Sequence, residues 1–176
     1  LLGSTDFDLE REASLVDTVL GYSPSGMIMT GLRHRESAER RLKAWGRPVV
    51  EIMELGVTCI DMNIGVENTE AGACMARHLV EQGYQRIAFL GTGMAHDYRA
   101  HLRYEGHCQA LKAAGIESDV LFQDDQPSSY EVGRKLFLEA LDARPELQAL
   151  HFANDNLAAG AILEANRIGV RVPQDI

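Results

Sequence analysis

The regular alternation of short apolar runs with longer segments of helical periodicity constrains the fold most strongly. The apolar runs of strand length are GMIMT, PVVEIM, RIAFLG, DVLFQ and LQALHFA, and TCIDMNIGV is a weaker run of mixed character. In the segments between them, apolar residues recur at the spacing of one helix face. Strands that alternate with helices are typical of parallel sheets covered by helices on both faces, so the predicted fold class is α/β.

Capping and turn residues bound the predicted helices. Asn68 is expected to cap a helix over about 69–82, with Glu70 favourable in its first turn and Gly83 at its end. We expect the other helices at residues 10–21, 35–45, 98–114 and 130–143, and after the run HFANDN, where the last helix is closed by Gly169.

The composition of the chain argues against a membrane span and against binding of nucleic acid by this segment alone. No apolar run approaches the ~20 residues of a membrane-spanning helix. The net charge is −9 over 176 residues. Because affinity for nucleic acid comes largely from Lys and Arg facing phosphates, this segment is predicted to bind nucleic acid poorly by itself. The chain begins with Leu1 and ends where another strand could begin, so we interpret it as part of a longer protein and leave a signal peptide upstream open.

The spacing of cysteine and histidine argues against metal sites. Cys59, Cys74 and Cys108 are odd in number and far apart, which argues against a disulfide framework and favours reduced, buried thiols in a cytoplasmic protein. The histidines show neither HxH nor HExxH spacing, and His101 and His107, six residues apart, do not share a helix face. The sequence therefore predicts neither a metal site nor a cofactor.

Ligands of parallel α/β sheets bind at the carboxyl ends of the strands, on the loops that follow. In FLGTGMAH, Gly91 and Gly93 follow a strand in the manner of a dinucleotide-binding loop. The GxGxxG pattern fails because His96 stands at the position of the third glycine, and the expected immediate helix is absent. A flexible loop is therefore favoured over a nucleotide site.

Two arginines lie early in the helix that follows this loop. Arg99 and Arg103 are four residues apart in DYRAHLRYEGHCQAL and share a helix face. Arg103 lies one turn in from the loop, where its guanidinium can reach a ligand and hold a carboxylate or paired hydroxyls in a bidentate manner. Spacing alone leaves a plain surface arginine as the alternative.

Three polar residues in a row mark the start of the last helix. In HFANDNLAAGA, either Asn154 or Asp155 can serve as the helix N-cap, which leaves a second amide free to face a ligand. From spacing, the cap and the ligand interpretations remain equally open.

No group of residues is arranged for bond cleavage. Glu51 and Glu54 in PVVEIMELG would point to opposite sides of an extended strand, so they make a poor acid–base pair. The sequence contains no GxSxG nucleophile elbow and no Walker loop. The chain is therefore not expected to be an enzyme.

Three ordered segments of the sequence carry recognisable motifs: IGVENTEAGACMARHLVEQGYQRIAFLG at residues 64–91, LRYEGHCQAL, and HFANDNLAAGAILEANRIGVRVPQDI at residues 151–176. They resemble the lactose/galactose repressor family of bacterial transcription regulators. Their order and spacing agree with the family, and the likeness covers nearly the whole chain. The segments PVVEIMEL and CIDMNIGVEN resemble, more narrowly, the gluconate-utilisation repressors of this family.

The resemblance implies a two-lobed effector-binding and dimerisation domain with the fold of periplasmic binding proteins. It divides the chain into an N-terminal lobe at about 1–65 and a C-terminal lobe at about 66–176, each a partial parallel sheet covered by helices. It further implies a cytoplasmic homodimer without membrane contact, which binds operator DNA through a helix-turn-helix headpiece absent from this stretch. A small sugar or sugar acid that contacts both lobes would shift the regulator between two states.

The resemblance also assigns roles to individual residues. Arg103 corresponds to the arginine that grips the hydroxyls or carboxylate of the effector, and Asn154 to a polar residue that contacts it from the second lobe. Asp155, beside it, is then expected to cap the helix and support the pocket, and Asn156 to be solvated. Thr30 corresponds to a polar strand-end position in the first lobe.

Two departures from the family pattern favour an acidic effector. Ser128 occupies a position where the family often has an aromatic ring. Without that ring, a pyranose loses a stacking partner. Met53 stands where many sugar-binding members carry an aspartate, and its neutral side chain does not repel an anion or neutralise Arg103. We therefore expect an open-chain sugar acid such as gluconate. A periplasmic sugar-binding protein of a transport system is the alternative, and a sugar-modifying enzyme is less favoured because no catalytic pair is found.

Overall fold

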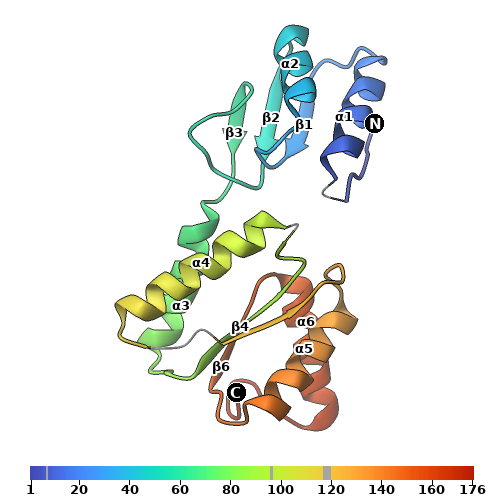
Figure 1. Cartoon of the computed structure of the whole chain (residues 1–176). Helices are drawn as coiled ribbons and strands as arrows, with labels where there is room; N and C mark the ends of the chain where they lie inside the picture. The colour runs from blue at the N-terminus through green and yellow to red at the C-terminus, as the bar shows by residue number, and fades with distance from the viewer. Residues whose placement is uncertain (7, 96, 117–119) are drawn as a thin grey trace. The chain divides into compact units, whose positions relative to one another are not determined.

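The computed structural model describes residues 1–6, 8–95, 97–116 and 120–176. The chain forms two compact units, Leu1–Glu67 and Asn68–Ile176. Each unit contains its own parallel three-stranded sheet, and Figure 1 follows their elements along the chain. The predicted α/β class is confirmed, as is the alternation of strands with helices.

The N-terminal unit contains two helices and a sheet of strand order β1-β2-β3. Its elements are α1 (Leu9–Leu20), β1 (Met27–Thr30), α2 (Glu36–Trp45), β2 (Val49–Ile52) and β3 (Met62–Ile64). Helix α1 begins after Asp8, whose carboxylate accepts hydrogen bonds from the backbone N–H groups of Glu10 and Arg11. Helix α2 ends at Gly46, which adopts the left-handed conformation at φ 67° that favours glycine.

One face of the N-terminal sheet carries the core of this unit. Side chains of α1, α2, β1 and β2 form that core, namely Val16, Met29, Ala38, Leu42 and Val49. On the other face, Ile28, Met62 and Ile64 are 70%, 44% and 67% exposed. Helices therefore cover one face of this sheet within the described residues, whereas the sequence pattern led us to expect two covered faces.

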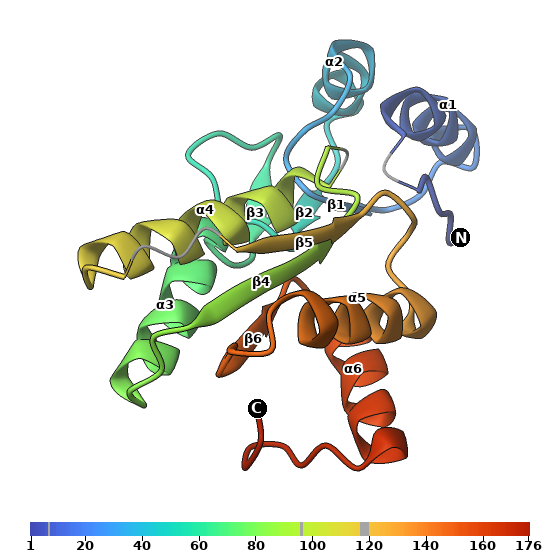
Figure 2. The ribbon, with the colours of Figure 1, turned by 60° about the horizontal axis from the view of Figure 1, so that its bottom comes forward.

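The C-terminal unit contains a sheet of strand order β5-β4-β6 between two pairs of helices. Helices α3 and α4 lie against one face and α5 and α6 against the other, as Figure 2 shows. All six residues of β4 are buried, as expected for a central strand covered on both faces. The elements are α3 (Asn68–Glu81), β4 (Ile87–Thr92), α4 (Tyr98–Ala113), β5 (Leu121–Asp124), α5 (Tyr130–Ala143), β6 (Ala149–Phe152) and α6 (Asp155–Ile168).

Glycines bring the backbones of α3 and α4 into close contact. A Cβ atom at Gly72 would lie 1.9 Å from the carbonyl oxygen of Arg103, and one at Gly106 would lie 1.8 Å from that of Thr69. Neither site has room for any other residue. Because the contact at Gly72 is with the backbone of Arg103, it also fixes the position of Arg103 relative to α3.

The substitution Gly106→Ala is expected to lower the free energy of unfolding by about 3 kcal/mol, because the added methyl group must push α3 and α4 apart. Urea denaturation of the full-length protein measures this change. The control is Lys112→Ala on an exposed position of the same helix, for which the expected change is below about 0.5 kcal/mol. A change that small at Gly106 would contradict the backbone contact.

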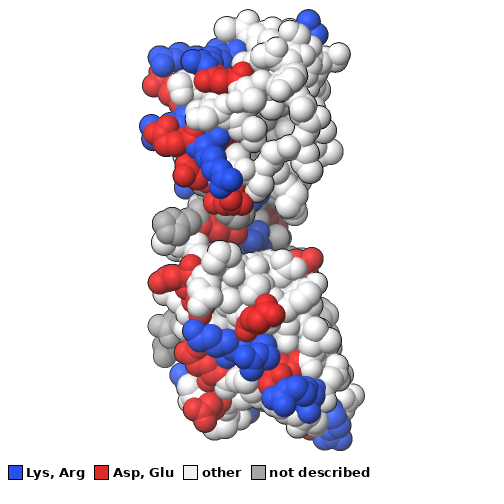
Figure 3. Space-filling model, turned by 90° about the vertical axis from the view of Figure 1, so that its right-hand side faces the viewer, with Lys and Arg blue, Asp and Glu red and all other residues white. Residues whose placement is uncertain are grey.

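Charges of both signs lie on the face of the molecule that Figure 3 shows. On the face shown in Figure 3, Lys and Arg lie interspersed with Asp and Glu, and no continuous basic surface is visible there. No helix within the described ranges has the length and apolar character needed to cross a membrane.

The three cysteines are free thiols, but their predicted burial was wrong. Cys59 and Cys74 are exposed and Cys108 is half-buried. Cys59 lies in the loop before β3 and Cys74 lies on an exposed position of α3. Wide spacing along the sequence carries no information about which face of an element a cysteine occupies.

Candidate functional site

The carboxyl ends of the C-terminal strands bring together several of the predicted site residues. Ser128 lies in the loop between β5 and α5, Asn154 directly before α6, and Arg103 in the second turn of α4. The three strands run parallel, so their carboxyl ends meet at one edge of the sheet. This is the edge where ligands of parallel sheets bind.

Arg103 is held at this edge by two neutral acceptors. Its Nε donates a hydrogen bond to the carbonyl oxygen of Ala153 at 2.8 Å, and its Nη1 donates to Oδ1 of Asn68. Both acceptor residues are buried. Burial lowers the pKa of Arg103. The negative charge of Asp97 opposes this shift, and the positive charge of Arg99 adds to it. The guanidinium remains charged, and it forms no ion pair with a carboxylate in the described part of the chain.

Arg99 occupies a different environment one turn earlier. Asp97 is the N-cap of α4, and its carboxylate accepts hydrogen bonds from the backbone N–H groups of Arg99 and Ala100. The Nε of Arg99 lies 3.7 Å from the same carboxylate oxygen. The negative charge at this helix start is therefore closest to Arg99, whereas the hydrogen bonds of Arg103 among the described residues go to uncharged groups.

Asn154, and not Asp155, is the N-cap of α6, so the predicted capping role of Asp155 was wrong. The extended backbone of Asn154 places its Oδ1 to accept from Leu157 N at 3.2 Å, and Ser128 Oγ donates to the same oxygen at 2.8 Å. The exposed Asp155 is the first helical residue, and its carboxylate accepts from Asn156 N. The hydrogen bonds of the described residues leave the Nδ2 donors of Asn154 unused.

Asn68 was predicted as the cap before a helix over about 69–82, whereas the structure includes it in α3 and joins it to Arg103. It is the first residue of α3, it is buried, and its Oδ1 accepts the hydrogen bond from Arg103. The two residues are 35 positions apart in the sequence. No local pattern reveals such a contact.

In the N-terminal unit, two predicted residues lie at the carboxyl ends of neighbouring strands. Thr30 is the last residue of β1 and is exposed. Met53 directly follows β2, is 56% exposed, and has a φ of 76°, a conformation that is uncommon outside glycine. Because Thr30 pairs with Ile52, the two predicted residues lie at the same edge of this sheet.

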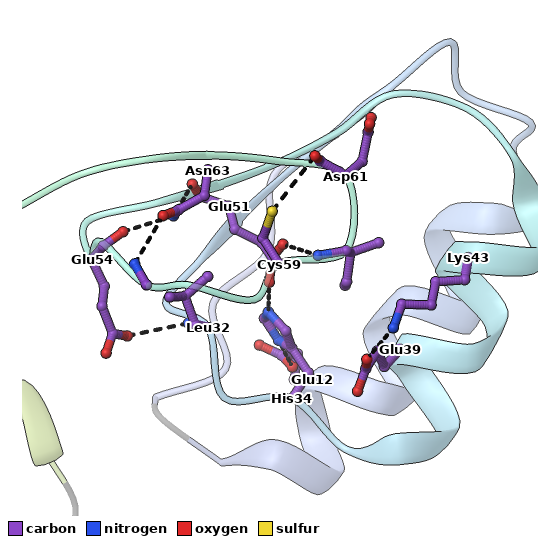
Figure 4. A network of polar contacts seen from close by, with 12 residues as sticks. Glu12, Leu32, His34, Glu39, Lys43, Glu51, Glu54, Cys59, Asp61 and Asn63 are labelled. Carbon is purple, nitrogen blue, oxygen red and sulfur yellow. Dashed lines mark hydrogen bonds and ion pairs between the residues drawn. The ribbon is translucent and has the colours of Figure 1, made fainter.

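A buried histidine between two carboxylates was not predicted from the sequence. Nδ1 of His34 lies 2.7 Å from Oε1 of Glu12, and its Nε2 lies 3.1 Å from Oε1 of Glu51, as Figure 4 shows. Burial lowers the pKa of His34, but hydrogen bonds and charges from both carboxylates outweigh this effect and raise it. Both ring nitrogens are engaged, so the cluster ties α1 and the loop after β1 to β2.

The glycine loop of the C-terminal unit leads from β4 to α4, which begins at Tyr98. Gly91 lies within β4, and Gly93 follows the strand with a φ of 56°. His96, which broke the dinucleotide pattern, lies outside the described residues.

A family model described as a periplasmic binding protein-like domain matches residues 76–176. Two similar proteins are named HTH-type transcriptional regulator GntR. The one from Pseudomonas aeruginosa is 37% identical over 181 residues, and the one from Escherichia coli K12 is 31% identical over 176 residues. These alignments cover 100% of this chain but 51% and 52% of the relatives, so the chain spans about half their length.

Solved structures of similar proteins share the fold. The crystal structure of a LacI-family transcriptional regulator from Silicibacter pomeroyi aligns with a TM-score of 0.92 and 36% identity, over 100% of this chain and 53% of that one. The crystal structure of the transcription regulator GntR from Chromobacterium violaceum aligns with a TM-score of 0.89 and 36% identity, over 99% of this chain and 64% of that one.

Proposed function

The chain belongs to the family of periplasmic binding protein-like domains, in the form found in LacI-family regulators, and we propose that it is the effector-binding and dimerisation domain of a transcriptional regulator. Its effector is a sugar acid of the gluconate type, and the regulator controls genes for carbohydrate use. The regulator is a cytoplasmic homodimer that contacts operator DNA through a segment outside these residues. The relatives reported above are named as regulators, and none is named as an enzyme.

The observation that carries this proposal is the arrangement of hydrogen-bond donors around Arg103. A guanidinium has five N–H donors, and the bonds to Ala153 and Asn68 use only part of them. Asn154 directly follows Ala153, whose carbonyl oxygen accepts the bond from Arg103, and it adds the two N–H donors of its Nδ2. A group of donors with a net positive charge is complementary to the carboxylate and hydroxyl oxygens of a sugar acid.

The electrostatic surroundings favour an anion over a neutral sugar. The hydrogen-bond partners of Arg103 are uncharged, and the nearby negative charge of Asp97 is opposed by the positive charge of Arg99. Burial has removed part of the solvent around the guanidinium, and a hydrogen bond to a charged group contributes about 1.5–3 kcal/mol. A carboxylate bound here replaces part of the stabilisation that water gives the charged guanidinium. A neutral pyranose replaces less of it.

The substitution Asn154→Asp separates ligand binding from helix capping. Aspartate caps a helix as well as asparagine does, so the free energy of unfolding is expected to stay within about 0.5 kcal/mol. It removes the Nδ2 donors and adds a negative charge, so gluconate affinity should fall at least tenfold in titration calorimetry of the full-length protein. Asn154→Ala, in contrast, should also cost about 1 kcal/mol of stability. Unchanged affinity in both variants would leave Asn154 with the capping role alone.

A periplasmic sugar-binding protein of a transport system is the second candidate, since it shares the fold. The residues encoded before Leu1 distinguish the two functions. A basic helix-turn-helix supports the regulator, and an apolar signal sequence supports the transport protein. For the regulator, gluconate must also change the affinity of the full-length protein for its operator, because an effector acts through its different affinities for two states.

A further inference from the structure

Two buried histidines form a pair next to the proposed effector site. Nδ1 of His107 on α4 lies 3.0 Å from Nδ1 of His151 on β6. The two residues are only 1% and 7% exposed, and the ring of Phe89 packs against both imidazoles at centroid distances of 5.4 and 4.9 Å. Neither histidine is among the residues that we propose to contact the effector.

The distance between the two Nδ1 atoms restricts the protonation of the pair. Only one proton fits between them, so one ring donates from Nδ1–H and the other accepts at a bare Nδ1. The accepting ring is then the Nε2–H tautomer, and both rings are neutral. Burial lowers the pKa of His107 to about 4, and burial with the charges of His107 and Arg103 lowers that of His151 to about 3.

The histidine pair and Arg103 join the same two elements. His107 follows Arg103 by four residues, so the two side chains leave α4 from the same face. His151 precedes Ala153 by two residues at the end of β6. Two side-chain hydrogen bonds thus run from α4 to this stretch, one between the histidines and one from Arg103 Nε to the carbonyl of Ala153.

We propose that His107 and His151 are positioning residues for effector binding, whose shared hydrogen bond sets the distance between α4 and β6 and so aims the guanidinium of Arg103. This proposal rests on the proposed function, because it assigns the effector contact to Arg103. A pair of apolar rings in the same place would pack against each other but would not form the directional bond that fixes the spacing of the two elements. The directional bond between the two Nδ1 atoms does so.

The test compares the double variant His107→Phe/His151→Phe with His151→Asn in the full-length protein. The double variant keeps two aromatic rings beside Phe89 and removes the hydrogen bond. In His151→Asn, the amide places a polar atom where Nδ1 of the histidine was, so the bond to His107 can re-form. The control is His101→Phe, the same substitution at an exposed position of α4.

Two readouts are recorded for each variant. The first is the NMR signal of the Arg103 Nε–H group without effector, identified by its loss in Arg103→Lys. The second is the dissociation constant of gluconate. In the double variant the Nε–H proton should exchange with water at least tenfold faster, and gluconate should bind about tenfold more weakly. His151→Asn and His101→Phe should match the wild type within about twofold.

A purely structural pair predicts a different pattern. Unchanged Nε–H exchange and unchanged gluconate affinity in the double variant would overturn the proposal. If the double variant does not fold, His151→Phe is compared with His151→Asn, and equal exchange rates in these two would overturn it as well. If the wild type binds no sugar acid, the proposed function fails, while the Nε–H signal still decides the positioning role because it needs no effector.

Discussion

Replacing Arg103 with methionine is expected to weaken gluconate binding at least a hundredfold. Two charge-assisted hydrogen bonds to a carboxylate, at about 1.5 kcal/mol each, correspond to a factor of that size. Arg103→Lys keeps the charge but loses the planar fork and the bonds that hold it, so it should lose more than tenfold. Titration calorimetry of the full-length protein measures both effects.

The matched control for Arg103 is Arg77→Met on the neighbouring helix α3. Arg77 is exposed and pairs with Glu70 on the surface, where an ion pair contributes little. Its removal should leave gluconate affinity within a factor of two. Equal affinities for Arg103→Met and the wild type would show that the guanidinium has only a structural role at this edge of the sheet.

Acidification is expected to destabilise the wild type more than a variant without the histidine pair. The pKa values of His107 and His151, about 4 and about 3, lie below the 6.5 of an exposed histidine. Between these values the unfolded chain binds protons that the folded chain excludes, so stability falls as the pH drops below about 6.5. At pH 5 the loss relative to pH 8 is about 2 kcal/mol for each histidine.

Urea denaturation at pH 8 and pH 5, at one protein concentration, gives the loss of unfolding free energy for each protein. The effect of the histidine pair is the difference between the loss in the wild type and the loss in His107→Phe/His151→Phe. His34 acts with the opposite sign. Its pKa is raised, so its contribution is complete below about 6.5 and is lost as the pH rises through the raised value. Because His34 is present in both proteins, its contribution cancels in the difference. An equal loss of stability in both proteins would contradict buried, neutral rings.

Local patterns were sufficient to predict most of the elements. The helix over 130–143 was predicted from its helical periodicity with the bounds that α5 has. The structure adds that Ser129 caps its start. The end at Gly169 was also predicted, because a left-handed residue closes the helix there. In the mixed run TCIDMNIGV only Met62–Ile64 forms a strand, and its position depends on pairing with β2.

The sequence predicted that Arg103, Ser128 and Asn154 lie near strand ends, but it did not predict the contacts among the residues there. Asn154 and Asp155 are adjacent and both are good N-caps, so only the backbone conformation decides which of them caps α6. The bonds from Arg103 to Asn68 and between the two histidines join residues 35 and 44 positions apart. Such contacts depend on how helices pack on a sheet, which the spacing of residues does not encode.

The most direct test of the proposed function is a calorimetric titration of the wild-type full-length protein with gluconate, glucose and galactose. The donors around Arg103, whose hydrogen-bond partners among the described residues are uncharged, predict that gluconate binds and that both neutral sugars bind at least a hundredfold more weakly. Tight binding of glucose or galactose, together with no binding of gluconate, would contradict the account.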